Sequence, residues 1–114
     1  MKENIILDKT YRFAVGMTVV CKKLKEKKEY HLASQLIRSA TSIGANVREA
    51  SAAQTKRDFI AKMSIASKEA REANYWVNII KESKVMDIDY SIYIKESEEI
   101  VKILTAILKT AKSR

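Results

Sequence analysis

Residues 36–76 read LIRSATSIGANVREASAAQTKRDFIAKMSIASKEAREANYW. Within and beside this stretch, apolar residues recur at alternating steps of four and three positions, in two runs separated by a polar break. The first run consists of Leu32, Leu36, Ala40, Ile43, Val47 and Ala50, and the second of Phe59, Met63, Ala66, Ala70, Ala73, Val77 and Ile80. Because this near-heptad spacing is typical of helices that pack along one face, the stretch predicts two amphipathic helices.

The polar break between the two runs has the residues of a helix start. Thr55 and Asp58 resemble a capping box, in which the threonine hydroxyl accepts from an early backbone amide and the aspartate lies at the positive end of the helix. We therefore expect the two helices to form an antiparallel pair joined by a tight turn near residues 53–55.

The flanking segments predict one further helix on each side. The first follows Asp8 as its N-cap, and the last follows Asp87 or Asp89. Their apolar stripes are Phe13, Met17, Val20, Cys21 and Leu24 in the first helix, and Tyr93, Ser97, Ile100, Leu104, Ile107 and Ala111 in the last. Val101, Ile103 and Leu108 widen the last stripe beyond what a monomeric bundle needs, so we expect self-association to cover it.

Composition supports a single helical domain. The 114 residues include no proline and two glycines, and we find no repeat or linker. The fold expected for residues 1–114 is an all-α, antiparallel up-down-up-down four-helix bundle. Gly16 and Gly44 fall inside predicted helices, which indicates close approach by a neighbour. For Gly44 that neighbour is either another helix of the chain or another subunit.

The sequence also predicts a cytoplasmic protein that does not bind membranes. No apolar run reaches the roughly 18 residues that a membrane span needs, and residues 1–8 lack the features of a signal peptide. Cys21 is the single cysteine, so no internal disulfide can form, and we expect a buried, unreactive thiol.

No pattern of catalytic or metal-binding residues is present. A di-iron bundle needs a histidine on each of two helices, whereas His31 is the only histidine, and we expect it at the surface or at a helix cap. The serines lack a nucleophile elbow, and the glycines lie singly rather than in a phosphate-binding loop. We expect no enzyme activity, no metal and no cofactor.

Several polar residues border the apolar stripes of the central helices. They are Arg38, Asn46, Arg48, Glu49, Glu69, Arg71 and Glu72. We expect Arg38 or Arg48 to pair with Glu69 or Glu72 across the helix pair, with solvated surface ions as the alternative. Trp76 lies on the same flank, where a core or interface role is more common for tryptophan than base stacking.

The net charge of +8 favours polyanionic partners. The lysines gather in two groups, Lys22, Lys23, Lys25, Lys27 and Lys28 near the end of the first helix, and Lys102, Lys109 and Lys112 in the last. These groups should lie at opposite ends of the bundle. They are the candidate nucleic-acid contacts, although lysines near carboxyl-terminal helix ends are also favoured by the helix dipole.

The central stretch also carries a family signature. It comprises the Arg-Ser-x-x-Ser-Ile-Gly-x-Asn run at 38–46, then Glu49 and Ala50, the Asp58-Phe59-Ile60 helix start and Lys68-Glu69-Ala70. The chain resembles the four-helix bundle proteins encoded in intervening sequences of bacterial 23S ribosomal RNA genes, often labelled S23 ribosomal proteins. It is also similar to the accessory protein of diversity-generating retroelements, a basic pentameric barrel that binds nucleic acid and a reverse transcriptase.

This resemblance implies a homopentameric, non-enzymatic bundle and favours RNA or DNA binding. It offers no catalytic or ligand residues to carry over, and it gives Arg38, Asn46, Glu49, Glu69 and Glu72 a structural role in holding the second helix on the third. Two hypotheses follow. The first is an oligomer that binds nucleic acid without sequence preference, and the second is a structural or adaptor bundle that binds a protein partner without nucleic acid.

Overall fold

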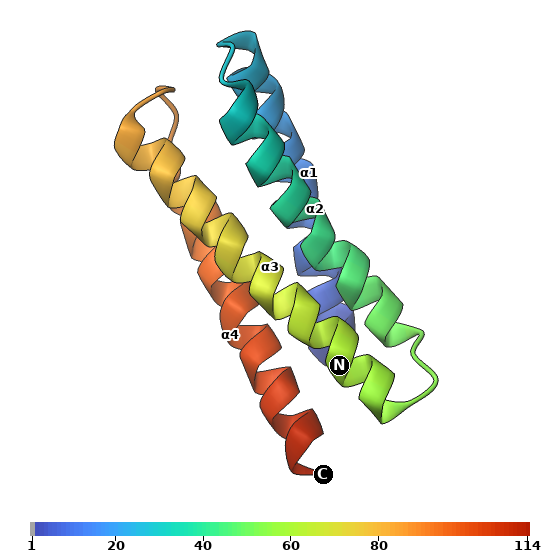
Figure 1. Ribbon diagram of the computed structural model, residues 1–114. Helices are drawn as coiled ribbons and strands as arrows, with labels where there is room; N and C mark the ends of the chain where they lie inside the picture. The colour runs from blue at the N-terminus through green and yellow to red at the C-terminus, as the bar shows by residue number, and fades with distance from the viewer. Residues whose placement is uncertain (1) are drawn as a thin grey trace.

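Four long helices make up almost all of the computed structural model, which describes the backbone of residues 2–114 and the side chains of residues 5–114 (Figure 1). The helices are α1 (Lys2–Glu26), α2 (Tyr30–Ser51), α3 (Lys56–Ser83) and α4 (Ser91–Ser113). Each runs antiparallel to the next, in a bundle of 47 × 20 × 18 Å. The predicted all-α, up-down-up-down architecture is confirmed.

Each helix packs on its two neighbours around the bundle. The α1–α2, α2–α3 and α3–α4 pairs are joined by short connections, and the least extensive contact closes the bundle between α1 and α4. The α1–α2 and α3–α4 connections lie at one end, while the α2–α3 connection lies at the other, together with the end of α4 (Figure 1). The first lysine group therefore lies at one end of the bundle, whereas the second extends from Lys102, in the middle of α4, to Lys112 near the other end.

The core follows the predicted stripes closely. In α2 and α3 every stripe residue except Leu32 and Phe59 is buried, and these two are half-buried against the core. Val101, Ile103 and Leu108 of α4 are also packed partly against the core, so the monomer itself covers part of the apolar surface for which the sequence predicts self-association. Within residues 2–114, no helix has an apolar stretch long enough to cross a bilayer.

The start of α1 differs from the prediction. The helix begins at Lys2, and Asp8 is an interior residue that pairs with Arg12 at 3.1 Å instead of capping the amino end. The stripe continues upstream through Thr10 to Ile6, both fully buried. Because threonine is polar, the sequence pattern does not indicate that Thr10 belongs to the apolar stripe. Its hydroxyl donates to the Ile6 carbonyl at 2.7 Å, and this hydrogen bond allows Thr10 to occupy a core position.

The connections contain one of the two expected caps and two unusual backbone conformations. The Thr55 hydroxyl accepts from the Asp58 amide at 3.0 Å, as predicted. The N-cap of α4 is Tyr90, without a side-chain cap, rather than Asp87 or Asp89, although the Asp89 carboxylate accepts from the Ser91 amide beside it. Lys28 and Lys84 have left-handed backbone angles, with φ of 63° and 56°, in the α1–α2 and α3–α4 connections. Glycine usually occupies this conformation at a helix end.

Both helix-interior glycines face other helices of the same chain. A Cβ on Gly44 would lie 3.3 Å from the Thr10 hydroxyl and 3.5 Å from the Thr10 carbonyl carbon, on α1. A Cβ on Gly16 would lie 3.2 Å from the ring of Tyr93, on α4. Of the two alternatives for Gly44, the structure shows packing within the chain.

Candidate nucleic-acid interface

The first lysine group occupies the last turns of α1 and the turn that follows. Lys22, Lys23, Lys25, Lys27 and Lys28 are all exposed, and none forms an ion pair with a side chain in residues 5–114. The left-handed conformation of Lys28 ends the helix, and the Glu29 amide donates to the Leu24 carbonyl at 2.9 Å. These lysines thus form a solvated, positively charged tip.

The second lysine group lies along the outer side of α4. Lys102, Lys109 and Lys112 are exposed and, among the side chains that the structure describes, are in no ion pair. They are held on a helix anchored by the buried residues Ile100 and Leu104. The helix therefore fixes where their stems begin, although each charged end remains in solvent.

Two further cations, Arg71 and Lys56, lie beside the second lysine group, although the sequence analysis does not assign them to it. The Arg71 guanidinium is 3.4 Å from the hydroxyl of Thr105 on α4, and the Lys56 ammonium contacts the carbonyl of Arg114. Arg71 borders the apolar stripe of α3, but the sequence does not show whether it turns toward α2 or α4. That choice depends on how the helices are rotated against each other.

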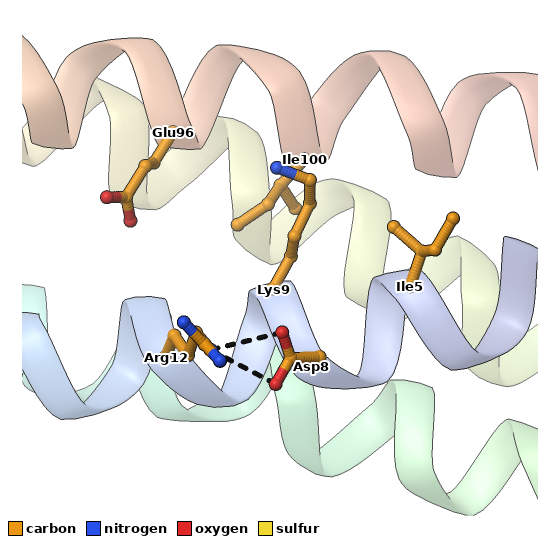
Figure 2. Close-up of a pocket in the computed structure, with 6 residues that line it drawn as sticks. All are labelled: Ile5, Asp8, Lys9, Arg12, Glu96 and Ile100. Atoms are coloured by element: carbon orange, nitrogen blue, oxygen red, sulfur yellow. Dashed lines mark hydrogen bonds and ion pairs between the residues drawn. The ribbon is translucent and has the colours of Figure 1, made fainter.

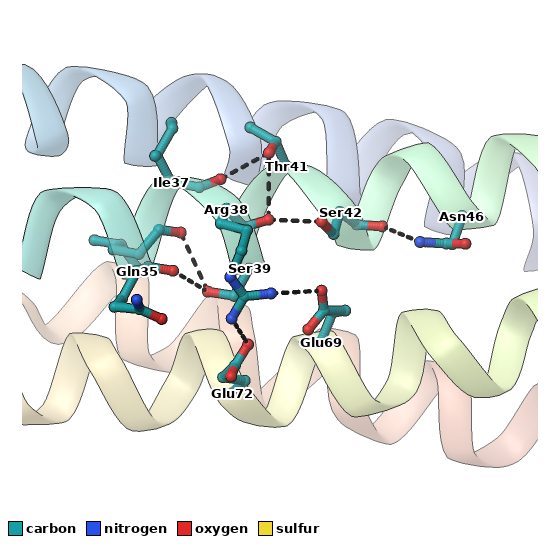
Figure 3. Close-up of polar contacts among 10 residues, drawn as sticks. Gln35, Ile37, Arg38, Ser39, Thr41, Ser42, Asn46, Glu69 and Glu72 are labelled. Atoms are coloured by element: carbon teal, nitrogen blue, oxygen red, sulfur yellow. Dashed lines mark hydrogen bonds and ion pairs between the residues drawn. The ribbon is translucent and has the colours of Figure 1, made fainter.

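A charged network joins α2 and α3 (Figure 3). Arg38 lies 3.2 Å from Glu69 and also hydrogen-bonds Glu72. The Glu69 side chain is only 12% exposed, so Arg38 neutralises a carboxylate that is largely withdrawn from water. The hydrogen bond from Arg38 lowers the pKa of Glu72 below its ordinary value, and the same bond raises the pKa of Arg38. The pairing expected for Arg38 is present.

The other polar residues of the signature have different contacts. Glu49 pairs with Lys62 of α3 at 3.1 Å, so it does link α2 to α3. Asn46 donates to the Ser42 carbonyl at 2.8 Å within α2 (Figure 3), and this contact does not join the two helices. Arg48 is exposed beside α1, near Tyr11, and does not take the place of Arg38.

Trp76 lies half-buried between α2 and α3. Its ring meets His31 edge-on, with ring centroids 6.0 Å apart, and meets Tyr75 in the same manner at 5.3 Å. Its indole nitrogen is buried without a hydrogen-bond partner among the described residues. This packing agrees with the expected interface role, and it leaves the exposed Tyr75 as the more accessible ring.

A groove of about 320 Å³ lies between α1 and α4 (Figure 2). Ile5, Asp8, Lys9, Arg12, Glu96 and Ile100 line it. Two of its charged groups, Arg12 and Asp8, pair with each other, and Lys9 pairs at 2.9 Å with Glu99 of α4, which lies outside the lining. The groove thus combines an apolar floor with ion pairs at its rim.

Neither a reactive thiol nor a metal centre emerges from the described side chains. Cys21 is buried in the core, and burial raises its pKa to about 11, which disfavours the reactive thiolate. In residues 5–114, no three His, Cys, Asp or Glu side chains are placed to hold a metal ion together.

Together, the fold and the side chains define a class of protein, a small basic four-helix bundle with exposed cationic surfaces. The profile of the 23S rRNA-intervening sequence protein family matches residues 2–106. The chain belongs to this family.

A solved structure supports the same assignment. It is that of a protein of unknown function from the S23 ribosomal protein family of Bacteroides thetaiotaomicron VPI-5482, and it is 42% identical to this chain. The similarity covers 96% of this chain and 99% of that one, with a TM-score of 0.90. Comparison with curated proteins finds no match.

Proposed function

We propose that this protein is a non-enzymatic, cytoplasmic, self-assembling bundle that binds RNA or DNA through its basic surfaces. The observation that carries the proposal is the exposure of both lysine groups without neutralising partners among the described side chains, on a chain of net charge +8. Phosphate contacts of this kind give affinity without sequence preference and release counterions on binding.

Self-assembly, as a homopentamer in our proposal, is supported by an apolar strip on the outside of α1. Val15 and Val19 are each 50% exposed and lie on the side of α1 turned away from its core residues, whereas Ile5, at 51%, lies at the edge of the groove toward α4. A second copy of the chain is the partner we assign to this strip. Assembly would repeat each lysine group around a ring and thereby strengthen binding through multivalency.

A second candidate function is an adaptor that binds a protein partner without nucleic acid. The observation that favours it is the exposure of Ile65 and Tyr75 on the outer side of α3, at 44% and 58%. Aromatic residues such as tyrosine are enriched in protein interfaces. This candidate requires no contact with the lysine groups.

The test is fluorescence anisotropy of labelled RNA and DNA with the purified protein over a salt series, with the mass of the same sample measured by sedimentation. We expect binding by an oligomer, with an affinity that falls steeply as salt rises. Absence of binding to both nucleic acids at low salt would overturn the proposal. A protein partner captured from lysate and retained after nuclease treatment would favour the adaptor.

A further inference from the structure

One contact between helices gathers positive charge on the α3–α4 side of the bundle. Arg71 of α3 lies 3.4 Å from Thr105 of α4. Thr105 follows Lys102 by three residues and precedes Lys109 by four, so each lysine is one helical turn from it on neighbouring surface. The guanidinium of Arg71 is thus placed beside two exposed lysines of the other helix.

The same surface continues to the end of the bundle. Lys112 lies seven residues after Thr105 and therefore near the same side of α4. At that end the Lys56 ammonium, from the first turn of α3, contacts the Arg114 carbonyl. We call Lys56, Arg71, Lys102, Lys109 and Lys112 the α3–α4 basic face.

The carboxylates nearest this face are those of Glu98 and Glu99, four and three residues before Lys102, and Glu99 is paired with Lys9 of α1. None of the members of the face is in an ion pair with a side chain in residues 5–114. A groove of about 500 Å³ between the two helices is lined by Arg71, Asn74, Glu98, Val101 and Lys102, and Glu98 is the carboxylate in that lining. Asn74 donates its amide hydrogen to Ser97 at 2.8 Å and so is held in place.

The Lys22–Lys28 tip is surrounded by more carboxylates than the α3–α4 basic face is. Glu26 and Glu29 lie within or next to the lysine run. The last turn of α3 and the α3–α4 connection add further carboxylates at the same end of the bundle (Figure 1). These are Glu82, Asp87 and Asp89, with Lys81 and Lys84 beside them. A long polyanion that covered this end would meet both signs of charge.

The spacing on the basic face suits a phosphodiester chain. Lys102 and Lys109 are about 10.5 Å apart along the axis of α4, from a rise of about 1.5 Å per residue. A nucleic-acid strand in a duplex has a phosphate about every 3.4 Å of axis, so about three phosphates cover that distance. Arg71 supplies the third cation, and its planar fork can bind two oxygens of one phosphate.

We propose that the nucleic-acid backbone lies along the α3–α4 basic face, with Arg71, Lys102 and Lys109 as phosphate ligands, and that the Lys22–Lys28 tip is not the principal site. This inference rests on the proposed function and specifies which surface performs it. It also adds Arg71, which the pattern of lysines alone does not indicate.

The experiment compares two variants that lose three positive charges each. One carries R71Q, K102Q and K109Q, and the matched control carries K22Q, K25Q and K27Q. Each is titrated with labelled single-stranded and duplex DNA and the corresponding RNA over a salt series. For the first variant we expect the slope of log affinity against log salt to become shallower by about 2 on single strands and by nearly 3 on duplex DNA. The control should keep the wild-type slope.

The outcomes separate this inference from the function on which it rests. If the wild-type protein binds no nucleic acid, the proposed function fails and the inference fails with it. If the wild type binds but the control loses affinity as much as the first variant, or more, the basic face is not the site while the function stands. Circular dichroism melting checks folding of both variants, and the single exposed changes K102Q and K109Q replace the triple variant if it unfolds.

A conservative change tests the role of the guanidinium. R71K keeps the charge but removes the fork, so we expect an unchanged salt slope with an affinity several-fold weaker at every salt concentration. Affinity equal to that of the wild type would show that Arg71 acts only as a charge, and would overturn its assignment as a bidentate phosphate ligand.

Discussion

Gly44 and Gly16 show how one residue type has different consequences in two helix interiors. Alanine at either position should gain up to about 1 kcal/mol in helix propensity. At Gly16 the new methyl group would meet the side-chain ring of Tyr93, which can rotate away. At Gly44 it would meet Thr10, which is fully buried and whose backbone carbon also lies close, at 3.5 Å.

We therefore predict that G16A is more stable than G44A by about 1 kcal/mol, a difference of about 4 °C in melting temperature for a domain of this size. Thermal unfolding followed by circular dichroism measures it. A gain in G44A equal to that in G16A would mean that α1 and α2 can separate slightly at Thr10 without cost.

At the scale of the helix pair, Arg38 fixes α3 against α2 by holding two carboxylates. R38Q leaves the largely buried Glu69 without its partner, so we predict a loss of about 1 to 2 kcal/mol at pH 7. R48Q is the matched control, because Arg48 is exposed and in no ion pair among the described side chains, and it should change stability by less than about 0.5 kcal/mol.

The same pair predicts a pH dependence. The pKa of Glu72 is lower in the folded protein than its ordinary value, so the folded state is stabilised above the ordinary pKa and loses this stabilisation as pH falls through the folded pKa. Urea unfolding should show the wild type losing more stability than E72Q below about pH 4, by under about 1 kcal/mol because both side chains are partly exposed. Parallel curves for the two proteins would contradict the pairing.

The helices could be predicted from the sequence because their signals are local. The stripes from Leu36 to Ile80 follow a spacing that one helix alone determines, and the hydroxyl of Thr55 caps a helix that begins one residue later. The start of α1 could not be predicted, because the buried Thr10 reads as a polar interruption unless its bond to the Ile6 carbonyl is known.

Contacts between helices were harder to predict than the helices. The pairing of Arg38 with Glu69 could be predicted, because both residues border the apolar stripes along which α2 and α3 pack. The contact of Arg71 with Thr105 could not be predicted, since it depends on how α4 is rotated about its axis relative to α3. The apolar pattern of one helix does not specify that rotation. For the same reason the wide apolar arc of α4 suggested a subunit contact, whereas Val101 and Leu108 pack partly on the core of the monomer.

For the whole molecule, the exposed strip on α1 leads to a prediction about assembly. In V15K/V19K the two added charges lie where we expect a second copy to pack, so the sedimentation mass should fall from that of an oligomer to that of a monomer without loss of helical signal. Y75K, which adds a charge to the exposed surface of α3, is the control and should leave the mass unchanged. The reverse pattern would move the contact from α1 to α3.

The α1–α2 and α3–α4 connections each contain a lysine in a backbone conformation that favours glycine. The left-handed conformations of Lys28 and Lys84 each carry a steric cost of about 1 to 2 kcal/mol that glycine would not have. The two residues lie at the same end of the bundle, so the fold tolerates this strain twice in one place. The protein could be made more thermostable by glycine at these two sites alone, at the loss of two of its positive charges and without disturbing a single core contact.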